Sequence, residues 1–292
     1  MRIACAFVLV AALGGIIGTS ACKSPVPAPS AEPSWPTLEP AGAGYNSKVV
    51  GVRTTLGRAA IRLELRGTIA EIRTSTCTDA DARREQSGCV RCELAGDSDE
   101  LDEATLDALA RAFDRYPASF LVASRIDSVA LCKHIEYEDV VREFGTAGTV
   151  DYKQRRLFIS VETFIGRLYD ASGPFTVEDI VHHELFHLIE FEHMRAEMSD
   201  PEWRLHNPIG FEYRDGSPGS ERPRGFVNPY AATNELEDRA STYQYMMARP
   251  AELCELAAVD PAVRAKARLI WSRVAALDGD AFLRQRALCG GW

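Results

Sequence analysis

The segment His183-Glu184-Leu185-Phe186-His187 is the part of the sequence most able to do chemistry. Two histidines four residues apart on a helix share one face, so both imidazoles can reach one metal ion. Zn²⁺ accepts histidine nitrogens at about 2.0–2.1 Å. Glu184 lies beside the pair, in position to accept a proton from a water that such an ion activates. The motif predicts a zinc site with His183 and His187 as ligands and Glu184 as general base.

A helix is predicted over 176–191, and it would position these side chains. Thr176 can cap the start, acidic residues fill the first turn, and no glycine or proline interrupts the pattern before Pro201. Four of the six histidines fall between positions 182 and 193. This clustering argues against the alternative that the histidines of the motif are ordinary residues on a half-buried helix.

A third protein ligand is expected, because a catalytic zinc usually has three protein ligands and a water. His193 follows His183 by ten residues, as in HExxHxxGxxH sites, but Glu190 occupies the position where a chain reversal needs glycine. A continuous helix would carry His193 about 15 Å from His183. Unless the helix breaks at Glu190, His193 and His182 are expected in supporting or surface positions.

Glu237 is the stronger candidate, within the segment Gly-Phe-Val-Asn-Pro-Tyr-Ala-Ala-Thr-Asn-Glu-Leu-Glu-Asp-Arg-Ala-Ser that begins at Gly225. This pattern resembles the lethal-factor-like zinc metallopeptidases, the relatives of the anthrax toxin's catalytic domain. They carry HExxH and, some 50 residues later, a tyrosine followed seven positions on by the glutamate ligand. Tyr230 and Glu237 have that spacing, and Glu237 follows His187 by 50 residues.

The resemblance is dense over 177–247 and faint over 100–165. It implies an α+β, zincin-like metallopeptidase domain with a mixed sheet and an HExxH active-site helix. It also implies one Zn²⁺ per chain, with Glu237 as third ligand, and a peptide or protein substrate. Tyr230 would stabilise the developing oxyanion. The substrate would lie along an edge strand, for which Arg156–Val161 is the candidate.

Two positions depart from that family. Arg239 and Ser241 stand where it usually has phenylalanine and a second glutamate. Because the second glutamate normally orients the metal ligands, Ser241 favours an alternative function. In that alternative the protein is a non-catalytic lipoprotein with a structural or degenerate metal site, serving as an envelope binding module. An adhesion or scaffold domain without metal is a further possibility.

Simpler roles also exist for the proposed ligand segment. Asn234 and Glu237 form the pattern of a capping box, in which Glu237 would only bond the backbone at a helix start. Glu235 is a rival ligand close by on the same helix. Tyr230 could be a loop tyrosine that packs on the domain. The sequence leaves these alternatives open.

The N-terminal residues predict export. A basic Arg2, a short apolar run over 3–18 and small residues before Cys22 indicate a signal peptide over 1–21 and not a membrane span. The small residues resemble the lipobox of bacterial lipoproteins, although Thr19 stands where that motif prefers leucine. Cys22 would then carry a lipid anchor in the cell envelope. Plain secretion is the alternative.

The segment 22–47 predicts a tether between this anchor and the folded domain, which is expected over 48–292. It contains six of the 15 prolines, a composition that favours an extended spacer. The whole chain of 292 residues carries 33 Lys+Arg against 42 Asp+Glu, giving a net charge of −9. Without a basic block, this charge argues against nucleic acid as a partner.

Six cysteines remain after those at positions 5 and 22 are set aside. An even number in an exported protein suggests disulfides, and Cys254–Cys289 is the favoured pair. Cys89 and Cys92 form a CxxC pair that could be half of a zinc ribbon, but the sequence has no second CxxC.

The remaining patterns predict an α+β body. Strands are expected at Val49–Val52, Ala60–Leu65, Phe120–Val122 and Val129–Leu131, a helix at Glu103–Tyr116, and a hairpin over Gly148–Val161 that turns near Lys153.

Overall fold

The structure is a computed structural model that describes residues 47–65, 71–73, 89–96, 103–137, 146–161, 169–170, 173–194, 200–213, 221–279, 281–284 and 289. The chain divides into two units, Met1–Gly42 and Ala43–Trp292, and the described residues all belong to the second. The expected signal peptide, the anchor at Cys22 and most of the tether lie outside the described residues, as does Cys77.

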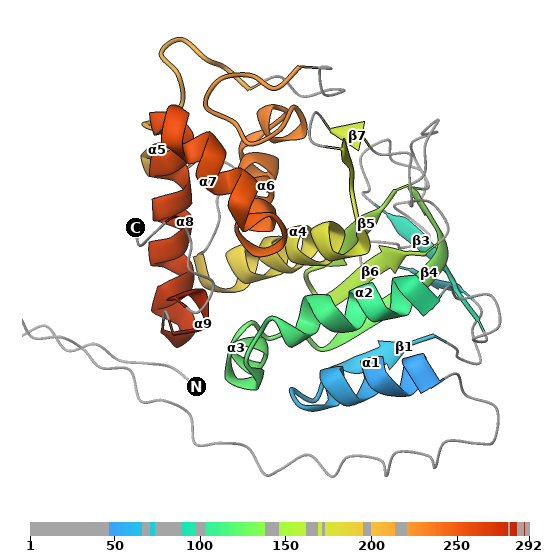
Figure 1. The fold of residues 1–292 in the computed structure, drawn as a ribbon. Coiled ribbons are helices and arrows are strands. Elements are labelled where there is room, and N and C mark those ends of the chain that lie inside the picture. The colour runs from blue at the N-terminus through green and yellow to red at the C-terminus, as the bar shows by residue number, and fades with distance from the viewer. Residues whose placement is uncertain are drawn as a thin grey trace, which may run out of the picture. The chain divides into compact units, whose positions relative to one another are not determined.

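A mixed sheet forms the framework of the second unit (Figure 1). Its strands are β1 (Arg62–Glu64), β2 (Glu71–Arg73), β3 (Val90–Leu94), β4 (Ser128–Tyr137), β5 (Gly148–Asp151) and β6 (Arg156–Ser160). The order is β2-β3-β4-β6-β5, with β1 also paired to β4. Strand β4 runs parallel to β1 and β6 and antiparallel to β3, while β5 and β6 form an antiparallel hairpin. The predicted α+β class with a mixed sheet is confirmed.

Both faces of the sheet are buried at its centre. In β4, Val129 and Leu131 join the large core, while Ala130 and Cys132 join a smaller cluster. Since successive side chains of a strand point to opposite faces, these two clusters lie on opposite sides of the sheet. Strand β6 alternates in the same way, with Phe158 in the smaller cluster. The larger core lies between the sheet and the helices.

Helix α4 (Val177–Ile189) occupies a central place (Figure 1). It contacts β5, β6 and α2 (Glu103–Asp114), and α2 in turn contacts α1 (Ser47–Gly57). It also packs against α6 (Glu235–Ala248), which contacts α7 (Pro250–Val259) and α8 (Pro261–Asp278). The remaining elements are α3 (Ala118–Ala123), β7 (Tyr169–Asp170), β8 (Gly173–Pro174), a π-helical segment (Glu190–Met194), α5 (Pro201–Arg204), a 3-10 helix (Tyr230–Ala232) and α9 (Ala281–Arg284).

Two predicted strands are wrong, because both segments are helical. Val49–Val52 lies in α1, where Val49, Val52 and Leu56 are buried at helical spacing and Val50 is exposed. Phe120–Val122 lies in α3, which begins directly after Pro117. The predicted helix at 103–116, the strand at 129–131 and the hairpin over 148–161 are confirmed.

The favoured disulfide Cys254–Cys289 is confirmed, and a second joins Cys92 to Cys132. The second disulfide links the neighbouring strands β3 and β4. Because Cys92 is bonded to Cys132, the CxxC pair does not supply two thiolates, and the zinc-ribbon alternative is wrong.

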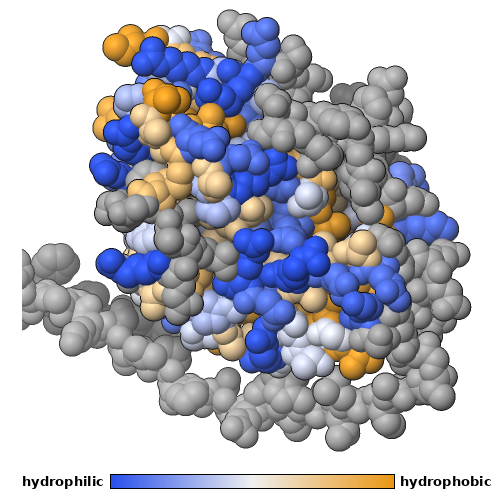
Figure 2. Space-filling view, in the orientation of Figure 1, coloured by the Kyte–Doolittle hydropathy of each residue, from blue (hydrophilic) through white to orange (hydrophobic). Residues whose placement is uncertain are grey.

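Among the described helices, none combines the length and the apolar character that a membrane crossing needs. On the face shown in Figure 2, hydrophilic and hydrophobic residues are interspersed over the described surface. Most large apolar side chains of the described segments are buried, and only a few, such as Leu205 and Ile209, are well exposed.

Candidate metal centre

Helix α4 presents the two histidines of the motif. Thr176 caps its start in a complete capping box with Asp179, as the sequence predicts for Thr176. The helix is buried along most of its length because it lies between the sheet and α6. His183 and His187 are 7% and 8% exposed, so their rings lie inside the protein near its surface.

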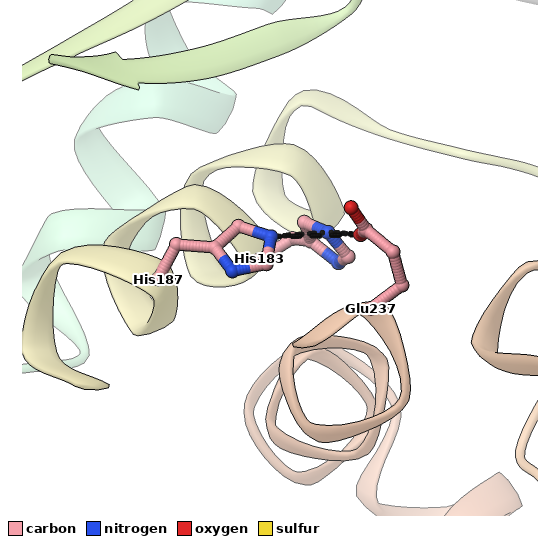
Figure 3. Close-up of side chains that lie close together, drawn as sticks. All are labelled: His183, His187 and Glu237. Carbon is pink, nitrogen blue, oxygen red and sulfur yellow. Dashed lines mark hydrogen bonds and ion pairs between the residues drawn. The ribbon is translucent and has the colours of Figure 1, made fainter. Parts of the chain in front are cut away.

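Helix α6 brings Glu237 to the same place. Asn234 caps this helix by accepting a hydrogen bond from the backbone N–H of Glu237. The carboxylate of Glu237 does not complete a capping box through the backbone but points toward α4 (Figure 3). The backbone of Glu237 therefore helps to start α6, and its side chain is available for the site.

The three candidate ligand atoms converge on one point. The Nε2 atom of His183 lies 2.8 Å from Oε2 of Glu237 and 3.2 Å from Nε2 of His187. The remaining separation, from Nε2 of His187 to Oε2 of Glu237, is 3.5 Å. Ligand atoms at the corners of a zinc tetrahedron are about 3.3 Å apart. These separations fit the coordination of one small cation, and this is the group among the described residues that could hold a metal.

The hydrogen bonds behind His183 orient its ring so that Nε2 faces Glu237. Gln244 donates through Nε2 to Oδ1 of Asp179 at 3.2 Å, and a carboxylate can only accept. The amide is thereby oriented with Oε1 toward Nδ1 of His183, also at 3.2 Å, so His183 donates from Nδ1. A neutral His183 then directs the lone pair of Nε2 at a carboxylate oxygen of Glu237. Two lone pairs this close require a proton or a metal cation between them.

The pKa values of His187 and Glu237 are shifted by their contact. Burial of the His187 ring lowers its pKa, but the charge of Glu237 and the hydrogen bond between them outweigh burial and raise it to about 9. Burial likewise opposes ionisation of Glu237, but the charge of His187 and the hydrogen bonds of both histidines lower its pKa. The group is thus built for a positive charge, and binding of a metal cation to these atoms releases a proton.

Glu184 and Tyr230 flank this group. Glu184 follows His183 on α4, and the residue as a whole is half-buried. Burial raises the pKa of Glu184, while the neighbouring His183 and His187 oppose this shift. Tyr230 opens the 3-10 helix before α6, and its ring centroid lies 5.8 Å from that of His183. Its side chain is 37% exposed, so it borders the site on the solvent side.

The rival ligands lie elsewhere. Glu235 contacts the backbone N–H of Asp200 and the side chains of Arg204 and Arg239. His182 is fully buried, and its Nδ1 lies 2.7 Å from the hydroxyl of Tyr116. His193 belongs to the π-helical segment that continues α4, so no reversal at position 190 returns it to the metal ligands.

Two buried ion pairs, formed by the residues that directly follow Glu237, connect α6 to α8 and to the end of α4. Asp238 contacts Lys266 of α8 at 2.7 Å and accepts hydrogen bonds from Trp203 and Tyr213. Arg239 contacts Glu190 at the end of α4. The ion pair of Arg239 and Glu190 thus connects α6 to the end of α4.

Gln244 was not identified from the sequence, although a signal existed. It follows Glu237 by seven residues, which places both on one face of α6. The sequence alone did not show that this face packs against His183. Asp179, which orients Gln244, is itself held by Arg249 at 2.9 Å through two nitrogens.

Replacing Gln244 with leucine is expected to weaken zinc binding about 10- to 100-fold, because supporting hydrogen bonds to metal ligands usually have effects of this size. The buried Nδ1–H of His183 would lose its acceptor, and the ring would lose its fixed orientation. A competition titration with a chromophoric chelator measures the change. Gln154→Leu, at an exposed glutamine in the β5–β6 turn, is the matched control. Equal zinc affinity in Gln244→Leu and wild type would show that Gln244 does not orient His183.

The chain can be compared with protein-family models, curated sequences and solved structures. No protein-family model matches the chain, and neither does any curated protein sequence. Among solved structures, the chain is similar to a putative zinc-binding metallo-peptidase from Bacteroides caccae, with 14% sequence identity and a TM-score of 0.42. The match covers 83% of this chain and 92% of that one. A likeness of this strength does not establish a shared family, so the geometry of the site carries the functional conclusion.

Proposed function

We propose that the protein is a zinc-dependent metallopeptidase of the lethal-factor-like type. The observation that carries this proposal is the convergence of His183 Nε2, His187 Nε2 and Glu237 Oε2, within 2.8–3.5 Å of one another, beside the carboxylate Glu184. Two imidazoles and one carboxylate are a ligand set that catalytic zinc sites use. A structural zinc usually has four protein ligands, so a three-ligand group with one open position favours catalysis.

Zn²⁺ held by these residues would lower the pKa of a water toward neutrality and polarise the scissile carbonyl. Glu184 accepts the proton of the attacking water at its carboxylate and delivers it to the leaving amine. Tyr230 donates its hydroxyl hydrogen to the developing oxyanion.

The substrate peptide is proposed to lie along β5, which replaces the earlier candidate Arg156–Val161. That candidate is wrong because β6 lies between β4 and β5 and is paired on both sides. In the described strand order β5 comes last, beyond β6, and extended peptides commonly bind by adding a strand at the end of a sheet. Helix α4 also contacts β5, which brings this edge toward the motif.

The same proposal includes export and anchoring. A signal peptide over 1–21, a lipid on Cys22 and a proline-rich tether over 22–47 would hold the domain over 48–292 near a membrane surface of the bacterial envelope. The two disulfides support an oxidising compartment, because such bonds persist outside the cytosol. Peptides or proteins of that compartment would be the substrates.

Zinc-dependent cleavage tests the proposal directly. The purified protein is incubated with a fluorescence-quenched peptide library. We expect cleavage that a chelator abolishes and that Zn²⁺, but not Mg²⁺, restores. Cleavage that continues at full rate after the chelator has removed all metal would contradict the zinc mechanism.

A non-catalytic metal site is the second candidate, and one feature favours it. Metal-binding histidines nearly always donate their second ring N–H to a partner. Nδ1 of His187 is buried and bonds to none of the described groups, and the same holds for Oγ of Ser241. Ser241 stands where the resembled family has its supporting glutamate. One zinc per chain without cleavage of any library peptide would favour this candidate.

A further inference from the structure

Gly148 opens β5 at the point where this edge strand passes α4. A Cβ atom added there would lie 2.7 Å from Cγ of Glu184 and 2.7 Å from Cγ2 of Ile180, with Oε1 of Glu184 at 3.1 Å. In real structures, a Cβ atom essentially never lies closer than 3.0 Å to a heavy atom of a residue that is not its neighbour in the chain. The space that a side chain at position 148 would fill is therefore taken up by the side chains of Glu184 and Ile180.

The backbone does not explain this glycine. The glycines of the described segments with positive φ are Gly96, Gly210, Gly225 and Gly279, and Gly148 is not among them. Any residue can adopt the extended conformation of β5, and a glycine in a strand otherwise marks a close approach. The close approach at Gly148 is to two side chains of α4 that lie one turn apart.

We propose that Gly148 is a positioning residue for Glu184, an inference that depends on the proposed peptidase function. The missing side chain allows the Glu184 carboxylate to lie against β5, next to the strand that would hold the peptide. Ile180 is 6% exposed and packed in the core, whereas Glu184 is long, flexible and partly exposed. A methyl group at position 148 would therefore displace Glu184 more than Ile180.

The expected result of Gly148→Ala is a kcat about 10- to 100-fold lower, because a displacement near 1 Å of a catalytic group has effects of this size. KM should change less than about twofold, because peptide pairing with β5 uses backbone atoms. Zinc should remain at one per chain with unchanged affinity, because the three heavy atoms nearest to the added Cβ belong to Glu184 and Ile180 and to none of the candidate ligands. A purely structural role would instead lower stability and zinc content together.

The experiment combines kinetics, zinc titration and a crystal structure of Gly148→Ala. Gly51→Ala in α1 is the matched control, because a Cβ there has nothing within 4 Å. A Glu184 carboxylate that moves away from β5, together with the loss of kcat, supports the proposal. An unchanged kcat, or a carboxylate in its original place, overturns it. The crystal structure decides the positional claim even if the wild type cleaves no peptide, so the failure of the two proposals can be told apart.

A second variant covers poor folding of Gly148→Ala. Ile180→Ala removes the Cγ2 atom that a methyl group at position 148 would meet, and leaves Glu184 as the contact. The double variant is compared with Ile180→Ala alone. A further loss of kcat in the double variant supports the role of Glu184. Equal kcat in the two would show that the effect passes through Ile180, and would overturn the proposal.

Discussion

Glu184→Gln is expected to abolish peptide cleavage while zinc stays bound. The amide has nearly the same shape as the carboxylate but cannot accept the proton of the attacking water, and removal of a general base usually lowers kcat about 10²- to 10⁴-fold. The ligand atoms of His183, His187 and Glu237 are unchanged. Elemental analysis should therefore still find one zinc per chain, and the measurement is kcat with the best peptide of the library.

The control for Glu184→Gln is Glu255→Gln, at an exposed position of α7. It makes the same chemical change far along the chain and should leave kcat unchanged. If Glu184→Gln keeps wild-type turnover, Glu184 is not the base. If it loses zinc as well as turnover, the residue supports the metal site, and the assignment as a base is wrong.

Glu237→Ala is expected to have the second large effect, a loss of zinc affinity of about 10²- to 10³-fold. Zinc bound by four protein ligands gains about 10–16 kcal/mol, so one ligand contributes roughly 2.5–4 kcal/mol. The variant keeps both histidines but lacks the carboxylate oxygen that lies 2.8 Å from His183 Nε2. Zinc affinity by chelator competition measures the change, and peptide cleavage should fall with zinc occupancy.

The adjacent glutamate tests the choice of ligand. Glu235 was a rival from the sequence, but its carboxylate contacts Arg204 and Arg239. Glu235→Ala should lower the melting temperature, because Arg239 would lose a buried partner. It should leave zinc affinity of the folded protein nearly unchanged. A larger loss of affinity in Glu235→Ala than in Glu237→Ala would show that the ligand was assigned wrongly.

Local sequence patterns were sufficient to predict where α4 and α6, the two helices that carry the candidate ligands, begin. The capping residues Thr176 and Asn234 are close in sequence to the helices that they start, and the HExxH spacing defines one helical face. Such features depend on neighbours within one or two turns. They could be predicted without knowing the fold.

Predictions from three or four residues were wrong where the hydrophobic period becomes visible only over a longer segment. Val49–Val52 looks like a strand when only four residues are considered. The buried residues Val49, Val52 and Leu56 reveal the helical period over eight residues. Phe120–Val122 is too short to show either period, and Pro117 was the better signal because proline favours a helix start.

The edge strand was assigned wrongly because pairing depends on tertiary structure. A strand with both faces buried usually lies inside a sheet, and Leu157, Phe158 and Ile159 of β6 are all fully buried. The first three residues of β5 are only half-buried. The contacts of Gln244 and Gly148 were missed for the same reason, since each joins residues more than 30 positions apart.

The ion pair between Lys266 and Asp238 ties the third ligand to the last long helix of the chain. Both side chains are at most 1% exposed. A fragment that ended before Pro261 would lack Lys266 and leave the Asp238 carboxylate, which is next to Glu237 in the sequence, without its cationic partner. Loss of one partner of a buried ion pair is strongly destabilising. The candidate metal centre therefore depends on residues far outside the HExxH segment, and we expect proteolytic removal of the C-terminal helices to weaken metal binding although all three candidate ligands would still be present.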